Sequence, residues 1–91
     1  MEIAALRHEE AFGLVIKELR KTRGISQEKL AFKGNLDRTF ISLLERGLRK
    51  PTLTTIIQLS NALEVEPDKL VALVMNKLME KRKHSEITRI P

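Results

Sequence analysis

The stretch SQEKLAFKGNLDRTFISLLERG, residues 26–47, contains the signals for two short helices joined by a tight turn. Ser26 is a favourable N-terminal cap for the first helix. The Gly34-Asn35 pair is expected to end that helix, because both residue types tolerate left-handed backbone angles. Asp37 is then placed to cap the second helix. The stretch therefore predicts a helix-turn-helix over residues 26–46.

The second of these helices has one apolar side and one polar side. Ile41 and Leu44 are three residues apart and share a face, so we expect them to pack inward. The residues left on the outer side are polar or basic: Arg38, Thr39, Ser42 and Arg46. A helix of about ten residues is about 15 Å long, and the DNA major groove, about 12 Å wide, can admit it.

The rest of the chain also predicts helices, because no long stretch alternates apolar and polar residues. Apolar residues at helical spacing predict a helix over residues 9–23, which Gly24 ends. Thr52 caps a fourth helix, whose expected apolar stripe consists of Leu53, Ile56, Ile57, Ser60 and Leu63. Pro67 suits the first position of a fifth helix, which we expect to end near residue 82.

The predicted fold class is therefore all-α, with five helices in one compact domain over residues 9–82. Residues 1–8 are expected to form an N-terminal extension, and residues 83–91 a flexible basic tail. The chain has 91 residues, which suits one small domain.

The composition excludes several classes of function. The chain has 17 Lys and Arg against 12 Asp and Glu, a net charge of +5, which favours a polyanionic partner, nucleic acid first. It has no cysteine and only two histidines, near opposite ends, so we expect no metal, no cofactor and no enzymatic activity. No apolar segment approaches the roughly 18 residues that span a bilayer, so we expect a cytoplasmic protein without a membrane partner.

These features together resemble the phage-repressor-like (Xre or Cro type) helix-turn-helix transcription regulators, with their five-helix lambda-repressor-like domain. The resemblance covers residues 12–70. Its marks are Gln27, Ala31, Ile41 and Leu44, the Glu45-Arg46-Gly47 segment and the Pro51-Thr52-Leu53 segment. One position departs from the family pattern, since Asn35 stands in the turn where the family usually has glycine.

The resemblance assigns DNA contacts to the outer face of the second helix and to the loop after it. Arg38 and Thr39 are best placed to reach base edges, with Ser42 and Leu43 one turn further on. Gln27 is expected either to face a phosphate, as its family equivalent does, or to act as a local cap. The remaining expected contacts are basic and suit the DNA backbone: Arg46, Arg49 and Lys50. For Arg49 the resemblance also implies the alternative of a base or minor-groove contact. For Lys50 a non-specific surface charge is an equal alternative.

Other residues are expected to be structural. Arg20 and Glu45 match a family salt bridge between the first and third helices. Phe40 is expected to be a partly buried packing residue, and Leu43 has the same alternative.

The fifth helix implies a partner, because LVALVM at residues 70–75 is apolar on every side. We expect Leu70 and Leu73 to serve the domain's own core. The exposed patch that remains is expected to form a homodimer interface in this dimerisation helix, about residues 67–82, and consists of Val71, Val74, Met75 and Leu78. The alternative is that residues 2–8 fold over this patch.

The resulting hypothesis is a sequence-specific regulator that binds double-stranded DNA as a homodimer on a palindromic operator. A repressor is expected in preference to an activator. The compact layout also resembles restriction–modification controller proteins. The alternative is an antitoxin-type DNA-binding protein that also binds a toxin partner.

Overall fold

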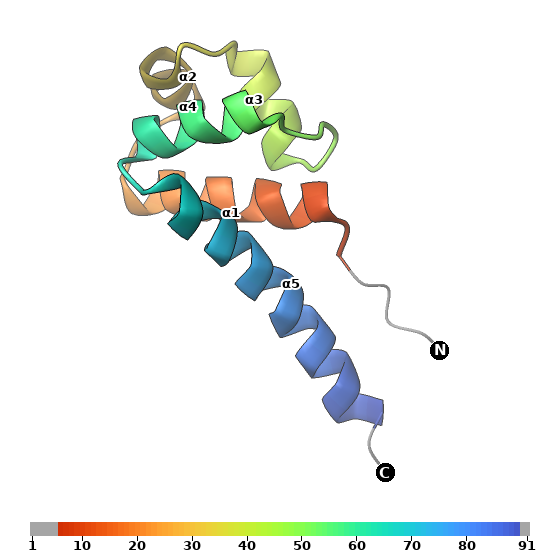
Figure 1. Cartoon of the computed structure of the whole chain (residues 1–91). Helices are drawn as coiled ribbons and strands as arrows, with labels where there is room; N and C mark the ends of the chain where they lie inside the picture. The colour runs from red at the N-terminus through yellow and green to blue at the C-terminus, as the bar shows by residue number, and fades with distance from the viewer. Residues whose placement is uncertain (1–5, 90–91) are drawn as a thin grey trace.

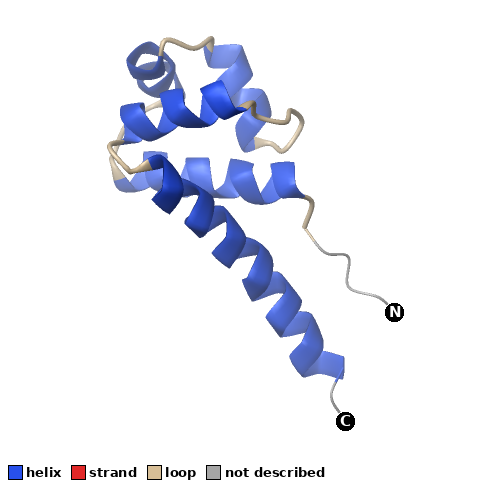
Figure 2. Ribbon diagram, viewed as in Figure 1, coloured by secondary structure: helices blue, strands red, loops and turns tan. Residues whose placement is uncertain are grey.

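The computed structural model describes residues 6–89, with side chains through residue 80. Over this range the chain forms five α-helices joined by short loops (Figure 2). These are α1 (His8–Thr22), α2 (Gln27–Gly34), α3 (Arg38–Glu45), α4 (Leu53–Leu63) and α5 (Pro67–Arg89). Residues 1–5, most of the predicted extension, lie outside the described part.

The helix starts that were predicted from capping residues are confirmed. Ser26 accepts a hydrogen bond from the backbone N–H of Lys29 at 3.0 Å, which holds the start of α2. Asp37 accepts from the N–H of Thr39 at 2.7 Å at the start of α3. Thr52 does the same for α4. These caps satisfy amides that have no partner inside their own helix.

The turn between α2 and α3 also has the predicted geometry. Asn35 lies in the left-handed region with φ 55°. The backbone N–H of Leu36 donates to the carbonyl oxygen of Ala31 at 2.8 Å. Asn35 therefore adopts the left-handed conformation in place of the glycine that the resemblance implied for this turn, because its short polar side chain tolerates this conformation.

The core lies between α1, α2, α3, α4 and the first part of α5 (Figure 1). α1 packs against α3 and α5, while α2 packs against α3 and α4. The largest fully buried apolar side chains come from all five helices: Ile16, Leu30, Ile41, Leu44, Leu59, Leu63 and Leu70. α5 starts in this core and then projects away from it (Figure 1).

Two helix faces differ from the predicted ones. On α4, Leu53 is 74% exposed and Ile57 is 42% exposed, although the predicted stripe included both. The buried face of α4 instead includes Thr55, Leu59 and Ala62, because α4 packs against α2 as well as α5. On α5, Leu70 is buried as expected, but Leu73 is 38% exposed.

α5 also continues to Arg89, beyond the end predicted near residue 82. No glycine or proline occurs between Pro67 and Pro91, so the backbone meets no residue that stops a helix. None of the helices in the described range is long and apolar enough to cross a membrane.

Candidate nucleic-acid interface

The outer face of α3 is set by two side chains that point the other way. Ile41 and Leu44 are fully buried, so the rotation of the helix about its axis is fixed. Arg38 and Thr39, in the first turn, are exposed, and Ser42 is half-buried one turn later. The structure therefore brings these three predicted site residues together on one accessible surface.

Phe40 and Leu43, the two other apolar residues of α3, are both half-buried. Phe40 packs against the hydrophobic core, as the sequence favoured. Leu43 retains an accessible portion beside the polar face, so it is available for an apolar contact from that side.

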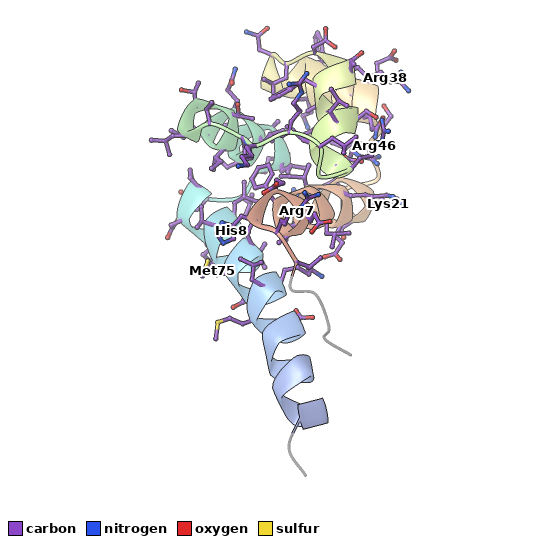
Figure 3. The ribbon with its side chains drawn as sticks, turned by 90° about the vertical axis from the view of Figure 1, so that its right-hand side faces the viewer. Arg7, His8, Lys21, Arg38, Arg46 and Met75 are labelled. Carbon is purple, nitrogen blue, oxygen red and sulfur yellow. The ribbon has the colours of Figure 1, made fainter. Side chains whose placement is uncertain are left out.

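Basic residues extend this face beyond α3. Arg46 and Arg49 are exposed. In Figure 3, Arg38 and Arg46 project from the same side of the molecule, and Lys21 at the end of α1 projects from that side too. Lys21 was not among the predicted contacts, because its position at the end of a helix explains its charge equally well. Only the packing of α1 against α3 places it on the same side of the molecule as the outer face of α3.

Lys50 is also exposed, but the structure places it at a different surface. It lines a groove of about 310 Å³ together with Phe12, Ile56, Val71 and Val74. This groove lies between the loop before α4 and the first half of α5. Of the predicted DNA contacts, Lys50 therefore lies next to α5 and not on the outer face of α3.

Gln27 is the first residue of α2, and its side chain makes a hydrogen bond inside the protein. Its Nε2 donates to Oε1 of Glu45 at 3.0 Å. The helix is capped by Ser26 and not by Gln27, so the predicted alternative of a local cap is wrong. A hollow of about 330 Å³ opens beside it, lined by Arg20, Ser26, Gln27, Glu28 and Arg38.

The ion pair expected between the first and third helices is present. Nε of Arg20 donates to Oε2 of Glu45 at 2.6 Å, and Nη2 donates to Oε1 at 3.0 Å. The hydrogen bond to Glu45 raises the pKa of Arg20. Nη1 of Arg20 also donates to the carbonyl oxygen of Ile25 at 3.0 Å. One guanidinium thus joins the end of α3 to the residue just before the cap of α2.

A second surface, on α5, is apolar. Val71 is 44% exposed and Met75 is 50% exposed, and Leu78 is half-buried. Val74, the fourth predicted interface residue, packs against the domain's own core while lining the groove. Met75 lies on the side of the molecule opposite Arg38 and Arg46 (Figure 3). We call Val71, Met75 and Leu78, with the neighbouring exposed Met79, the α5 patch.

The α5 patch has a neighbour that the sequence did not predict. Ile56 of α4 lines the same groove as Val71. The exposed Leu53 lies one turn before Ile56 on the surface of α4, and the exposed Ile57 lies one turn after Leu53. Sequence periodicity missed this extension because it assigned all three residues to one buried stripe.

Comparison with known proteins identifies the family of this domain. Residues 16–70 match the helix-turn-helix family model. The control protein C.BamHI of Bacillus amyloliquefaciens is 44% identical over 61 residues, which cover 66% of this chain and 75% of that protein.

Solved structures show the same similarity. The restriction–modification controller protein C.AhdI of Aeromonas hydrophila is 44% identical, with a TM-score of 0.66 over 68% of this chain and 94% of that one. The controller protein C.Esp1396I has been solved as a tetramer with its natural 35-base-pair operator. It is 32% identical to this chain, and the match has a TM-score of 0.75 and covers 81% of this chain and 97% of that one. Variants of C.Esp1396I have also been solved with substitutions of an arginine, a threonine and a tyrosine that are consecutive in its sequence.

Proposed function

This chain belongs to the helix-turn-helix family, and on that premise we propose that it is a sequence-specific, double-stranded DNA-binding transcriptional regulator of the controller-protein type. The observation that carries the proposal is the outer face of α3. Buried Ile41 and Leu44 leave Arg38 and Thr39 accessible in the first turn, which is the part of a recognition helix that meets base edges.

The proposed roles follow from side-chain chemistry. Arg38 donates two hydrogen bonds to O6 and N7 of a guanine, and Thr39 contacts a thymine methyl group or a phosphate. Ser42 and Leu43 complete the base contacts, while Gln27, Arg46 and Arg49 contact the phosphate backbone. Lys21 joins this group because it projects from the same side of the molecule as Arg38 and Arg46 (Figure 3).

The substituted triplet of C.Esp1396I supports these assignments. An arginine, a threonine and an aromatic residue follow one another only once in this chain, at Arg38, Thr39 and Phe40. The same order in a relative of similar fold agrees with a recognition role for the first turn of α3.

We further propose that the protein acts as a homodimer on a palindromic operator. The α5 patch and the exposed Leu53 and Ile57 would be covered by the same surface of a second copy, as a two-fold axis requires. Such a dimer presents two α3 helices about one DNA turn, roughly 34 Å, apart. Because Arg38 and Met75 face opposite sides, DNA and the second copy do not compete for one surface.

The mode of action is proposed to be repression of a promoter by occupancy, within the cytoplasm where genomic DNA lies. The relatives found are DNA-binding regulators and not enzymes. An antitoxin role is not favoured, because the similar proteins described above are controller proteins.

Selection of bound sequences from random duplex DNA tests this function. We expect enrichment of one sequence and its inverted repeat, with half-sites about one helical turn apart. Failure to enrich any duplex would overturn the DNA-binding proposal, and enrichment of a single unrepeated half-site would overturn the dimeric one.

A further inference from the structure

The carboxylate of Glu45 accepts hydrogen bonds from two other helices. Oε2 accepts from Nε of Arg20 at 2.6 Å, and Oε1 accepts from Nη2 of Arg20 at 3.0 Å. Oε1 also accepts from Nε2 of Gln27 at 3.0 Å. The side chain of Glu45 is only 3% exposed. The two bonds from Arg20 already neutralise the buried charge, so the bond from Gln27 has a different consequence.

That consequence is a fixed orientation of the Gln27 amide. An ionised carboxylate only accepts hydrogen bonds, so Nε2 of Gln27 must face Glu45 and Oε1 must point elsewhere. A freely rotating glutamine side chain can present either its oxygen or its nitrogen to an anion. Here one N–H is held by Glu45, and the second N–H of Nε2 remains a donor in a defined place.

The hollow beside the start of α2 is within reach of this donor, because Gln27 lines it together with Ser26, Glu28 and Arg38. Ser26 already holds the backbone amide of Lys29, but the amides of Gln27 and Glu28 also precede the first internal hydrogen bond of α2 and can face an anion here. Arg38 links the hollow to the proposed base-reading face of α3.

We propose that Glu45 is a positioning residue for DNA binding, which holds Gln27 with an N–H directed at a backbone phosphate. This inference rests on the proposed function. Glu45 does not touch DNA in this arrangement, and it acts through Gln27. The Glu45 carboxylate joins α3 to α1 through Arg20. Through Gln27, it also fixes where the phosphate contact of α2 lies relative to α3.

A double-mutant cycle on the full chain tests the proposal, with affinity for the selected operator as the measurement. Gln27→Met keeps the length of the side chain and removes its donor, so we expect binding to weaken about tenfold. Glu45→Gln replaces one acceptor oxygen by an NH2 donor, so either end of the Gln27 amide can face it and the orientation of that amide is no longer fixed. We therefore expect binding to weaken to a similar degree. In the Gln27→Met background, Glu45→Gln should cost no more than about a further twofold.

A structural role alone predicts a different outcome, because loss of the ion pair would lower affinity equally in both backgrounds. Equal losses would therefore overturn the positioning role. If Gln27→Met binds like the wild type, the role is also overturned, while the proposed function stands as long as Arg38→Ala loses sequence preference. If the wild type selects no duplex at all, the proposed function itself fails.

NMR of the wild-type protein provides a test that does not depend on folding of the Glu45→Gln variant. One of the two Nε2 protons of Gln27 should be shifted from its position in an unrestrained glutamine and protected from exchange with water in the free protein. On addition of operator DNA, the other proton should shift. Signals that match an unrestrained glutamine in the free protein, or that ignore the DNA, would overturn the proposal.

Discussion

Gly13 of α1 lies directly against the backbone of α3, where a Cβ atom in its place would overlap the carbonyl oxygen of Leu44. The same Cβ would lie 2.8 Å from the carbonyl oxygen of Glu45. Backbone oxygens at the end of a helix cannot turn aside as a flexible side chain can. Glycine is therefore what allows α1 and α3 to approach this closely, and the approach brings Arg20 within reach of Glu45.

Gly13→Ala is expected to destabilise the fold by about 1–3 kcal/mol, because α1 and α3 would have to separate. In an unobstructed helix the same change would stabilise by about 0.5–1 kcal/mol. Urea denaturation measures the difference. Gly34→Ala is the matched control, since an added Cβ there meets its nearest neighbour, a side-chain carbon of Leu36, at 3.4 Å. A stabilising Gly13→Ala would contradict this packing.

Arg20→Ala should lower the free energy of unfolding by about 3–5 kcal/mol, because it leaves the buried carboxylate of Glu45 unpaired. Lys77→Ala offers the comparison. Lys77 also pairs with a glutamate of another helix, Glu18, at 2.8 Å, but the Glu18 side chain is 60% exposed. Loss of that pair should cost below about 1 kcal/mol and should diminish further at high salt. Equal losses of unfolding free energy in the two variants would show that burial does not determine how much each ion pair contributes to stability.

Arg38→Ala is expected to cost about 1–3 kcal/mol on the selected operator and to relax preference at one base pair. Arg46→Ala should weaken binding to all sequences alike and reduce the salt slope by about 0.9, as expected for loss of one phosphate contact. Fluorescence anisotropy with operator and random duplexes separates the two. If Arg38→Ala loses affinity equally on both duplexes, Arg38 does not read bases.

Met75→Glu should convert the dimer to monomers, because it places a charge in the centre of the α5 patch. Position 75 is preferred to position 74, since Val74 also packs against the domain's own core and its loss would damage the fold. Sedimentation velocity measures the change. Phe32→Glu is the control, because Phe32 is highly exposed on α2 and should leave the dimer intact. A dimer that survives Met75→Glu would place the interface elsewhere.

Stability in acid should depend on Glu10. Its carboxylate accepts a hydrogen bond from the backbone N–H of Arg7 at 2.8 Å, and this bond lowers the pKa of Glu10. Because the folded-state pKa lies below the unfolded value of about 4.3, the contribution is present above that pH. It is lost as pH falls through the lowered pKa.

The difference in Tm between wild type and Glu10→Gln should accordingly shrink as the pH is lowered from neutral through this range. Thermal unfolding followed by circular dichroism at a series of pH values measures it. A difference that stays constant with pH would indicate that Glu10 does not act through its charge.

The sequence by itself determined the helices, their starts and the turn of the helix-turn-helix. These features depend on contacts within a few residues, such as Ser26 with Lys29 or Asp37 with Thr39. The inward direction of Ile41 and Leu44 was also predictable, because a short helix with two apolar residues on one side has one face to bury. The resemblance to a known family supplied the Arg20–Glu45 pair, which spacing alone would not have found.

Only the tertiary structure decided which apolar faces remain uncovered and which polar groups meet. Leu53 and Ile57 are exposed because α4 turns its other side toward α2, and the sequence of α4 does not contain that information. The bond from Gln27 to Glu45 and the close approach at Gly13 join residues 18 or more positions apart. Such contacts depend on how helices distant in the chain cross, whereas caps and turns depend on local backbone geometry.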